Sequence, residues 1–299
     1  MSLCNLCPRR CGAERTETSG NGFCRMGTLP VVARAAAHLW EEPCISGTRG
    51  SGTVFFSGCP LGCVFCQNES ISHHRLGQAM DAHALSELFA RVEALGVHNL
   101  NLVTPTHFAP VIFEALSLRR PGIPVVWNSS GYETVEMVRQ AAALVDIFLP
   151  DLKYYSAETA ARLAGAPDYF PVAMAAIRAM CEATDAPVYD ADGLMKRGTL
   201  VRHLILPLRT SESLRILDAV ASDLPPGTPV SLMRQYTPMN GVSLPGLDRR
   251  LTVREYARVR DHMLALGLEG YLQSRESADA AFTPDFTDEE SVRLFPAKN

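Results

Sequence analysis

The sequence has few charged residues, few aromatic residues and no block of like charge. Only 20% of its 299 residues are charged and 7% are aromatic. The 28 Lys and Arg residues nearly balance the 32 Asp and Glu residues, which gives a formal net charge of -4. Like charges occur only in short runs, such as the pairs Arg119-Arg120 and Arg249-Arg250. This pattern predicts no binding to nucleic acid or to an anionic membrane surface.

Long apolar runs are also missing. The N-terminus lacks the apolar stretch of a signal peptide, and no segment approaches the roughly 18 uninterrupted apolar residues of a membrane helix. We therefore expect a cytoplasmic protein. A reducing compartment disfavours structural disulfides, so the nine cysteines are expected to be metal ligands or reactive thiols. Eight of the nine lie within the first 66 residues.

Beyond the cysteine-rich part, short apolar runs alternate with segments of helical period, which is typical of repeated βα units. Right-handed crossovers would join about six such units into a parallel sheet, so we predict an α/β fold with a partial (βα)6 barrel of the TIM type. Strands are expected at 53–57, 99–103, 125–127, 145–149, 200–206, 230–233 and 270–272, and helices at 81–95, 109–118, 132–144, 157–163, 172–183, 212–224 and 253–266.

The chain is expected to have three parts. An apolar content of 47% can bury one full core, so a single barrel domain at 51–275 is the simplest division. A cysteine-rich extension at 1–50 would bind metal and cap or flank the barrel mouth. A C-terminal tail at 276–299 is expected to be a solvated segment.

Three cysteines follow the first predicted strand directly, at the strand end where barrel active sites are built. Cys59, Cys63 and Cys66 lie within eight residues, so their thiolates can reach three corners of one iron–sulfur cube. Gly58 and Gly62 allow the tight turns that such a loop needs. A ferredoxin cluster takes four cysteines, so a three-cysteine loop leaves one iron open to an outside ligand.

The same loop has two other interpretations. It would suit a zinc knuckle completed by Cys44 or His73, or a chance cluster of buried thiols. Neither alternative predicts the run of βα units that follows.

The Cys-x3-Cys-x2-Cys spacing, with Phe65 directly before the last cysteine, resembles the signature of the radical S-adenosylmethionine (SAM) superfamily. The resemblance implies that SAM chelates the open iron of a 4Fe-4S cluster, with Phe65 near the cofactor. It implies an enzyme that cleaves SAM reductively to a 5'-deoxyadenosyl radical and abstracts hydrogen from a substrate. An electron donor such as flavodoxin or ferredoxin would reduce the cluster.

Two later loops resemble segments that bind SAM in this family. Thr104 begins the segment 104–107, which stands where the family has a Gly-Gly-Glu-Pro segment for the methionine amino group, although the letters differ. The role of His107 in this segment is open, and packing is an alternative. Asn128 and Ser130 resemble a polar turn that meets the methionyl or ribose part of SAM, although an ordinary helix entry with a serine cap has the same appearance.

Charged residues after the next strands complete this candidate set. Asp151 and Lys153 resemble the Asp-Leu-Lys segment that helps to hold the SAM carboxylate in glycyl-radical-enzyme activating enzymes, and a surface salt bridge is the alternative. Arg202 lies inside an apolar strand and therefore needs a partner such as a carboxylate or the cofactor. Gln235, after the sixth predicted strand, is a further candidate.

A second set of cysteines lies in the extension. Cys4, Cys7, Cys11 and Cys24 suit either zinc or an auxiliary iron–sulfur cluster. Their irregular spacing favours iron–sulfur, because a zinc ribbon has paired Cys-x2-Cys knuckles. Reduced surface thiols without metal are the third possibility, and such exposed thiols would be prone to oxidation.

Together with the segment 40–47 and the end of the Cys59 loop, this set resembles the pyruvate formate-lyase activating enzyme-like subgroup, over residues 4 to 270. The subgroup implies hydrogen abstraction from a glycine of a partner glycyl radical enzyme. The alternatives are radical modification of a peptide or small metabolite, and a non-enzymatic iron–sulfur electron carrier or assembly protein. Cys44 is expected to line the site or to pack, and Cys181 to pack.

Overall fold

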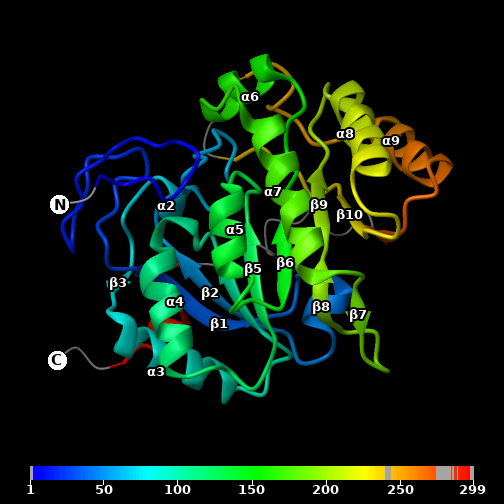
Figure 1. The fold of residues 1–299 in the computed structure, drawn as a ribbon. Helices are drawn as coiled ribbons and strands as arrows, with labels where there is room; N and C mark the ends of the chain where they lie inside the picture. The colour runs from blue at the N-terminus through cyan, green and yellow to red at the C-terminus, as the bar shows by residue number, and fades with distance from the viewer. Residues whose placement is uncertain (1–2, 240–243, 274–283, 285, 288, 297–299) are drawn as a thin grey trace.

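The structure is a computed structural model that describes residues 3–239, 244–273, 284, 286–287 and 289–296 (Figure 1). Its strands are β1 (Val31–His38), β2 (Ser51–Phe56), β3 (Gln78–Ala79), β4 (Leu100–Val103), β5 (Val125–Ser129), β6 (Ile147–Pro150), β7 (Val188–Tyr189), β8 (Met195–Thr199), β9 (Val201–Leu204), β10 (Val230–Met233) and β11 (Gly270–Leu272). Its α-helices are α1 (Pro43–Ser46), α2 (Glu69–Ser72), α3 (Ala82–Glu93), α4 (Ala109–Leu118), α5 (Val135–Ala141), α6 (Ala157–Ala164), α7 (Tyr169–Thr184), α8 (Thr210–Asp223), α9 (Val253–Ala265) and α10 (Glu289–Val292), with a 3-10 turn η1 (Thr106–Phe108).

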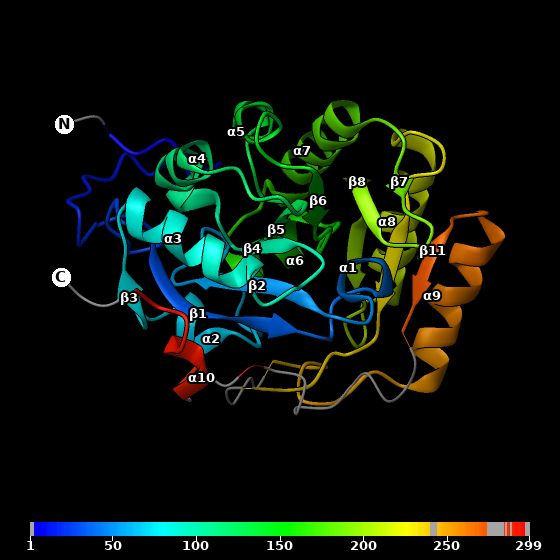
Figure 2. The same cartoon turned by 90° about the horizontal axis from the view of Figure 1, so that it is seen from below.

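The strands form two sheets that together make an open, curved wall (Figures 1 and 2). The larger sheet has the order β3-β1-β2-β4-β5-β6-β8-β7, and the smaller one β11-β10-β9. β2, β4, β5 and β6 run parallel, as do β9, β10 and β11. A parallel bridge between Asp151 and Arg202 links the end of β6 to β9. The α/β fold and the partial barrel are confirmed, and no ladder among the described residues closes β11 onto the β1 and β3 edge.

Capping side chains explain where several helices begin. Asp81 accepts from the amide of residue 84 at α3, Thr134 from that of residue 137 at α5, and Ser156 from that of residue 159 at α6. Thr252 and Glu255 form a reciprocal capping box at α9. Each side chain satisfies a backbone amide that the first helical turn leaves unpaired. None of the described helices is long and apolar enough to cross a membrane.

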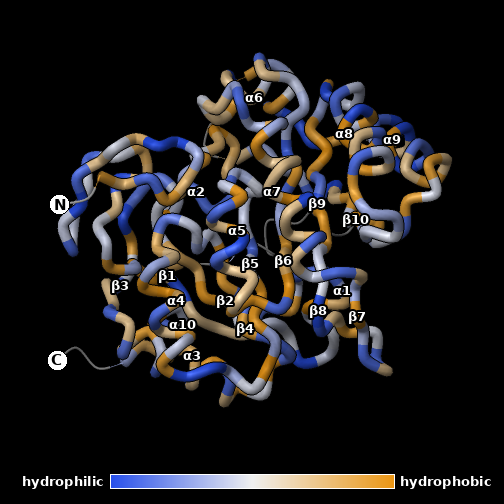
Figure 3. Tube along the Cα trace, in the orientation of Figure 1, coloured by the Kyte–Doolittle hydropathy of each residue, from blue (hydrophilic) through white to orange (hydrophobic). Residues whose placement is uncertain are grey.

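The two faces of the larger sheet differ in polarity, because successive side chains of a strand point to opposite faces. The outer face carries Val54, Leu102 and Trp127, which pack into the main core. Helices such as α3, α4, α5 and α7 lie along this side (Figures 1 and 2), and β2, β4 and β6 are largely hydrophobic (Figure 3). The inner face carries polar residues such as Asn101 and Asn128, which are buried. The barrel interior therefore presents polar side chains beside apolar ones such as Val126 and Ile147.

Four strands were not predicted from the sequence: β1, β3, β7 and β8. β1 pairs antiparallel with β2 inside the segment assigned to the extension. The search for βα repeats passes over β1, because half of its eight residues are Ala and an antiparallel neighbour needs no crossover helix. The predicted helix at 132–144 begins only at Val135, where Thr134 caps it.

The end of the chain also differs from the prediction of a solvated tail. Phe286 is 7% exposed and meets Phe55 edge-on, with ring centroids 5.3 Å apart. Ser291 in α10 is buried and accepts a hydrogen bond from Arg34 of β1 (2.7 Å). The described part of this segment thus packs on the barrel, while residues 276–283, 285, 288 and 297–299 lie outside the described residues.

Candidate active site

A tight loop after β2 carries three cysteines. Cys59, Cys63 and Cys66 follow the carboxyl end of the strand, and Gly58 and Gly62 turn the backbone with φ values of 77° and 63°. Glycine adopts such left-handed values without the steric penalty of other residues. The predicted position of the loop, at the carboxyl end of a parallel strand, is confirmed.

The three thiols of this loop fit the ligand set of an iron–sulfur cluster. All are free of disulfide bonds, and Cys63 is buried while Cys59 and Cys66 are half-buried. Burial raises the pKa of each thiol, and repulsion from neighbouring thiols of the loop adds to the rise for Cys59 and Cys63. Binding to iron requires the thiolate form of these residues, which burial and mutual repulsion disfavour. Metal coordination supplies positive charge and deprotonates them.

No three His, Cys, Asp or Glu side chains among the described residues are arranged to hold a single metal ion. A 4Fe-4S cluster makes a different demand, because each cysteine binds a separate iron. Cys44, one candidate to complete a zinc knuckle, packs with Ile45, Val126 and Ile147 inside the barrel, in a different core cluster from Cys63. Cys181 packs in the main core, as predicted.

The segment after β6 faces the cysteine loop with a cation and a hydrogen-bond donor. The Lys153 ammonium lowers the pKa of all three loop thiols, in opposition to the larger effect of burial. The Tyr154 hydroxyl donates a hydrogen bond to Cys63 Sγ (3.0 Å). Lys153 itself donates from Nζ to Asp151 Oδ2 (2.6 Å), and the two side chains are only 19% and 12% exposed, unlike those of a surface salt bridge.

Arg202 of β9 is the centre of a buried polar network. Its guanidinium donates to Asp151 Oδ1 (3.0 Å), to Glu41 Oε2 (3.1 Å) and to Asn128 Oδ1 (2.6 Å). Burial opposes ionisation of Asp151, but Arg202 and Lys153 outweigh it and hold the pKa of Asp151 below its usual value. The predicted carboxylate partner of Arg202 therefore exists, and the structure brings four predicted residues together: Asn128, Asp151, Lys153 and Arg202.

Two acidic residues of this network were missed in the sequence. Glu41 and Glu42 precede α1, which packs among inward-facing strand residues. Burial raises the pKa of both carboxyls against the pull of Arg202. Glu42 Oε2 and Asn101 Oδ1 have no hydrogen-bond partner within the described part of the chain. One feature of the sequence could have pointed to them: Arg202 needs a carboxylate partner, and the adjacent acidic residues Glu41 and Glu42 could supply it.

The other four predicted cofactor residues each have separate contacts or backbone features. Phe65 is buried and meets Tyr236 edge-on beside the cysteine loop, with ring centroids 5.8 Å apart. Thr104 has a φ of 60°, an unusual value for a β-branched residue, at the end of β4. Ser130 contributes its carbonyl oxygen to Tyr169. Gln235 contacts Gln273 (2.9 Å) and is not part of the Arg202 network.

The side chain of His107 is buried and hydrogen-bonded to the backbone. Its Nε2 lies 2.8 Å from the carbonyl oxygen of Ser57, just before the cysteine loop. Burial lowers the pKa of His107 to about 4, so the neutral ring donates this hydrogen bond. The packing role that the sequence left open is the one that the structure supports.

The cysteine-rich extension packs onto the same loop. Arg9 donates to the carbonyl oxygens of Pro60 (2.8 Å) and Leu61 (3.1 Å), and also to those of Ala164 (2.6 Å) and Gly165 at the end of α6. One guanidinium thus ties the extension, the cysteine loop and the terminus of α6 together. Carbonyl groups at a helix terminus have no partner inside the helix, so a cation there is favourable.

The four cysteines of the extension also lie near one another. Burial raises the pKa of Cys7 to about 12, and Cys24, Cys4 and Cys11 add to the rise. The pKa of Cys24 is raised in the same way, mainly by burial, with Arg15 opposing. The four thiols therefore lie within electrostatic reach of one another.

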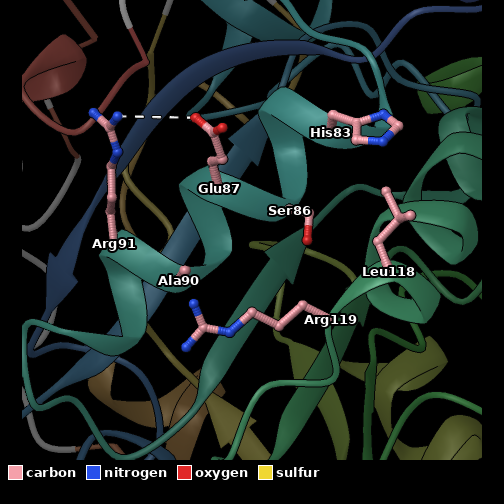
Figure 4. Close-up of a pocket in the computed structure, with 7 residues that line it drawn as sticks. All are labelled: His83, Ser86, Glu87, Ala90, Arg91, Leu118 and Arg119. Atoms are coloured by element: carbon pink, nitrogen blue, oxygen red, sulfur yellow. Dashed lines mark ion pairs between the residues drawn. The ribbon is translucent and has the colours of Figure 1, made fainter.

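A surface cavity of about 560 Å³ lies elsewhere, between α3 and the end of α4 (Figure 4). Its lining includes His83, Glu87, Arg91 and Arg119, and Arg91 forms an ion pair with Glu87 (4.0 Å). It shares no residue with the cysteine loop or the Arg202 network, so it is not the candidate active site.

Comparisons with known proteins identify one family domain and one fold. The family model of the Radical SAM superfamily matches residues 53–191. SuiB of Streptococcus suis, solved bound to S-adenosylmethionine, superposes with a TM-score of 0.53 at 12% identity, over 74% of this chain and 49% of SuiB. HydG, a maturase of the [FeFe]-hydrogenase, superposes with a TM-score of 0.52 at 15% identity, over 81% of this chain and 56% of HydG. The chain therefore spans about half the length of these two proteins, with which it shares the fold.

A relative in sequence extends the match beyond the central domain. An uncharacterized protein of Methanocaldococcus jannaschii is 30% identical over 262 residues, which cover 84% of this chain and 71% of the relative. The matched family region begins in β2 and includes the cysteine loop and the segment after β6. The chain contains a domain of the radical SAM superfamily, which spans residues 53–191.

Proposed function

We propose that this enzyme binds a 4Fe-4S cluster through Cys59, Cys63 and Cys66 and cleaves SAM reductively at the iron that they leave open. The observation that carries the proposal is the three-thiol loop at the carboxyl end of β2, faced by the Lys153 ammonium and the Tyr154 hydroxyl. A ferredoxin-like carrier would hold all four irons with protein ligands, so the three-cysteine loop supports an enzyme.

When bound, the cluster and SAM would supply one-electron cleavage of a carbon–sulfur bond and a 5'-deoxyadenosyl radical that takes a hydrogen atom from the substrate. The residues of this chain bind and orient. Lys153 and Arg202 are cations suited to the carboxylate of SAM. Asp151 and Glu41 hold these cations in place, and Asn128 presents an amide inside the barrel. The buried setting strengthens each of these polar contacts.

We further propose a glycine Cα of a partner glycyl radical enzyme as the source of the hydrogen atom. The barrel has an open edge between β11 and β3 in its described part, which suits a polypeptide loop as substrate. SuiB, which has the same fold, was also solved bound to its precursor peptide SuiA. A peptide with α-deuterated glycine should pass deuterium into 5'-deoxyadenosine. Transfer of deuterium only from peptides labelled at another residue would instead indicate peptide modification.

A second metal site at Cys4, Cys7, Cys11 and Cys24 is part of the proposal. The mutual electrostatic effects of these thiols support it. Cys24→Ala should remove the metal of this site alone, so iron and zinc counts would fall by that amount while some SAM cleavage remains. Unchanged metal content in Cys24→Ala would contradict the site.

The function itself is tested by anaerobic reconstitution with iron and sulfide, followed by dithionite and SAM. Wild-type protein should form 5'-deoxyadenosine, and single Ala substitutions of Cys59, Cys63 or Cys66 should abolish it. Cys181→Ala, which removes a packed thiol outside the site, should retain activity. Full activity in Cys63→Ala would refute the assignment.

A further inference from the structure

Tyr154 holds a fixed position against the cysteine loop. Its hydroxyl lies 3.0 Å from Cys63 Sγ, across a separation of 91 residues, and its side chain is 1% exposed. The ring meets Tyr169 edge-on, with centroids 5.1 Å apart, and Phe65 in the same way at 6.3 Å. Contacts on both sides restrict the ring, so the hydroxyl is directed at the sulfur by packing.

The backbone that carries Tyr154 is also anchored. Tyr169 Oη accepts a hydrogen bond from the amide of Lys153 (2.9 Å) and lies 2.8 Å from the carbonyl oxygen of Asp151. The side chains of Asp151 and Arg202 pair directly, which ties this segment to β9. The donor to Cys63 is therefore held by a buried framework rather than by a mobile loop.

A hydrogen bond to a ligand sulfur has a defined electrostatic effect on an iron–sulfur cluster. Reduction adds one negative charge, and a donor stabilises the more negative state more strongly. Hydrogen bonds to the sulfurs are among the features that set cluster potentials. Tyr154 is placed for this effect, because its hydroxyl donates directly to a ligand sulfur. Removal of the hydroxyl would delete the hydrogen bond and keep all three cysteine ligands.

We propose that Tyr154 raises the reduction potential of the cluster through its hydrogen bond to Cys63, and so makes the cluster easier to reduce. Tyr154 is a positioning residue in this scheme, because it acts on the cluster through a ligand. The inference rests on the proposed cluster at Cys59, Cys63 and Cys66.

The test is an EPR-monitored redox titration of reconstituted protein without SAM. Tyr154→Phe should lower the midpoint potential by an amount equivalent to about a tenfold change in the one-electron equilibrium, or about 59 mV. Tyr236→Phe is the matched control, because it removes a buried hydroxyl from a ring that also contacts Phe65 but donates to the carbonyl oxygen of Leu247 (2.6 Å). Its potential should stay at the wild-type value.

A second variant covers the case in which Tyr154→Phe fails to fold. Replacement of Tyr154 alone by 3-fluorotyrosine keeps the ring and strengthens the donor, so the potential should rise. An unchanged potential in either loaded variant, or an equal drop in Tyr236→Phe, would overturn the inference while the cluster assignment stands. Failure of the wild-type protein to bind a cluster would instead overturn the proposed function and this inference with it.

Discussion

At the scale of single residues, the barrel interior is organised around one buried cation. Arg202 contacts Asp151 and Glu41, and each of the three side chains is only 10–12% exposed. A buried charge without a partner is strongly unfavourable, so the loss of one member leaves the others uncompensated. The need of Arg202 for a carboxylate was predictable from its apolar strand. The identity of Glu41 was not, because the fold alone brings residues 161 positions apart into contact.

Arg202→Met should therefore destabilise the protein by about 3 kcal/mol, since it leaves buried carboxylates without their cation. Urea unfolding at neutral pH measures the change. Arg197→Met is the control, because the ion pair of Arg197 with Asp185 (3.7 Å) is exposed and should contribute well under 1 kcal/mol. Equal stability of the two variants would contradict the buried network.

Glu42 predicts a specific pH dependence. Burial raises its folded-state pKa above the ordinary value of 4.5, so between these two values the folded state binds more protons than the unfolded state. The free energy of unfolding should therefore fall as pH rises from 4.5 through the raised pKa. Glu42→Gln should flatten this fall and stabilise the protein at neutral pH. The exposed Glu182→Gln should leave the slope unchanged, and a slope in Glu42→Gln that equals the wild-type slope would refute the prediction.

At the scale of secondary structure, period and turn chemistry predicted most elements. The bounds of α4, β10 and β11 match those expected. Each of these segments keeps a single hydrophobic periodicity and is flanked by residues that interrupt it. β1 was missed because an antiparallel strand before the first repeat breaks the βα pattern. β8 was missed because its Lys196, Arg197 and Gly198 interrupt any apolar run.

Arg9 connects the cysteine-rich extension to the cysteine loop and to the end of α6. Arg9→Lys keeps the charge but cannot donate to four carbonyl groups at once. Amide hydrogen exchange in residues 57–66 should become about tenfold faster, which corresponds to the loss of roughly one net hydrogen bond. Arg10→Lys, at an exposed neighbour, is the matched control. Equal exchange rates in the two variants would show that Arg9 does not order the loop.

At the scale of the whole molecule, the chain returns from the far end of the barrel to its first strands. Phe286 packs on Phe55 of β2, and α10 lies against β1. The sequence did not predict this return, because one aromatic residue among acidic neighbours carries no periodic signal. Phe286 covers an inward-facing apolar patch, and burial of this patch favours the contact. The patch is composed of Ala33, Phe55, Ile71 and Val103.

Phe286→Ala should lower the free energy of unfolding by about 2 kcal/mol, because it uncovers this patch and leaves a space. The midpoint of urea unfolding should shift while the slope of the transition stays constant. Val292→Ala, at a side chain that is 53% exposed, should have little effect. A wild-type midpoint for Phe286→Ala would show that the segment does not stabilise the barrel.

The central claim is that Cys59, Cys63 and Cys66 hold a 4Fe-4S cluster with one open iron. It is tested most directly by EPR of the reduced protein carrying the Cys24→Ala substitution, recorded with and without SAM. We predict a 4Fe-4S signal that changes when SAM binds, together with about four irons per chain. A signal that is identical with and without SAM, or a protein that takes up zinc and no iron at this loop, would contradict the account.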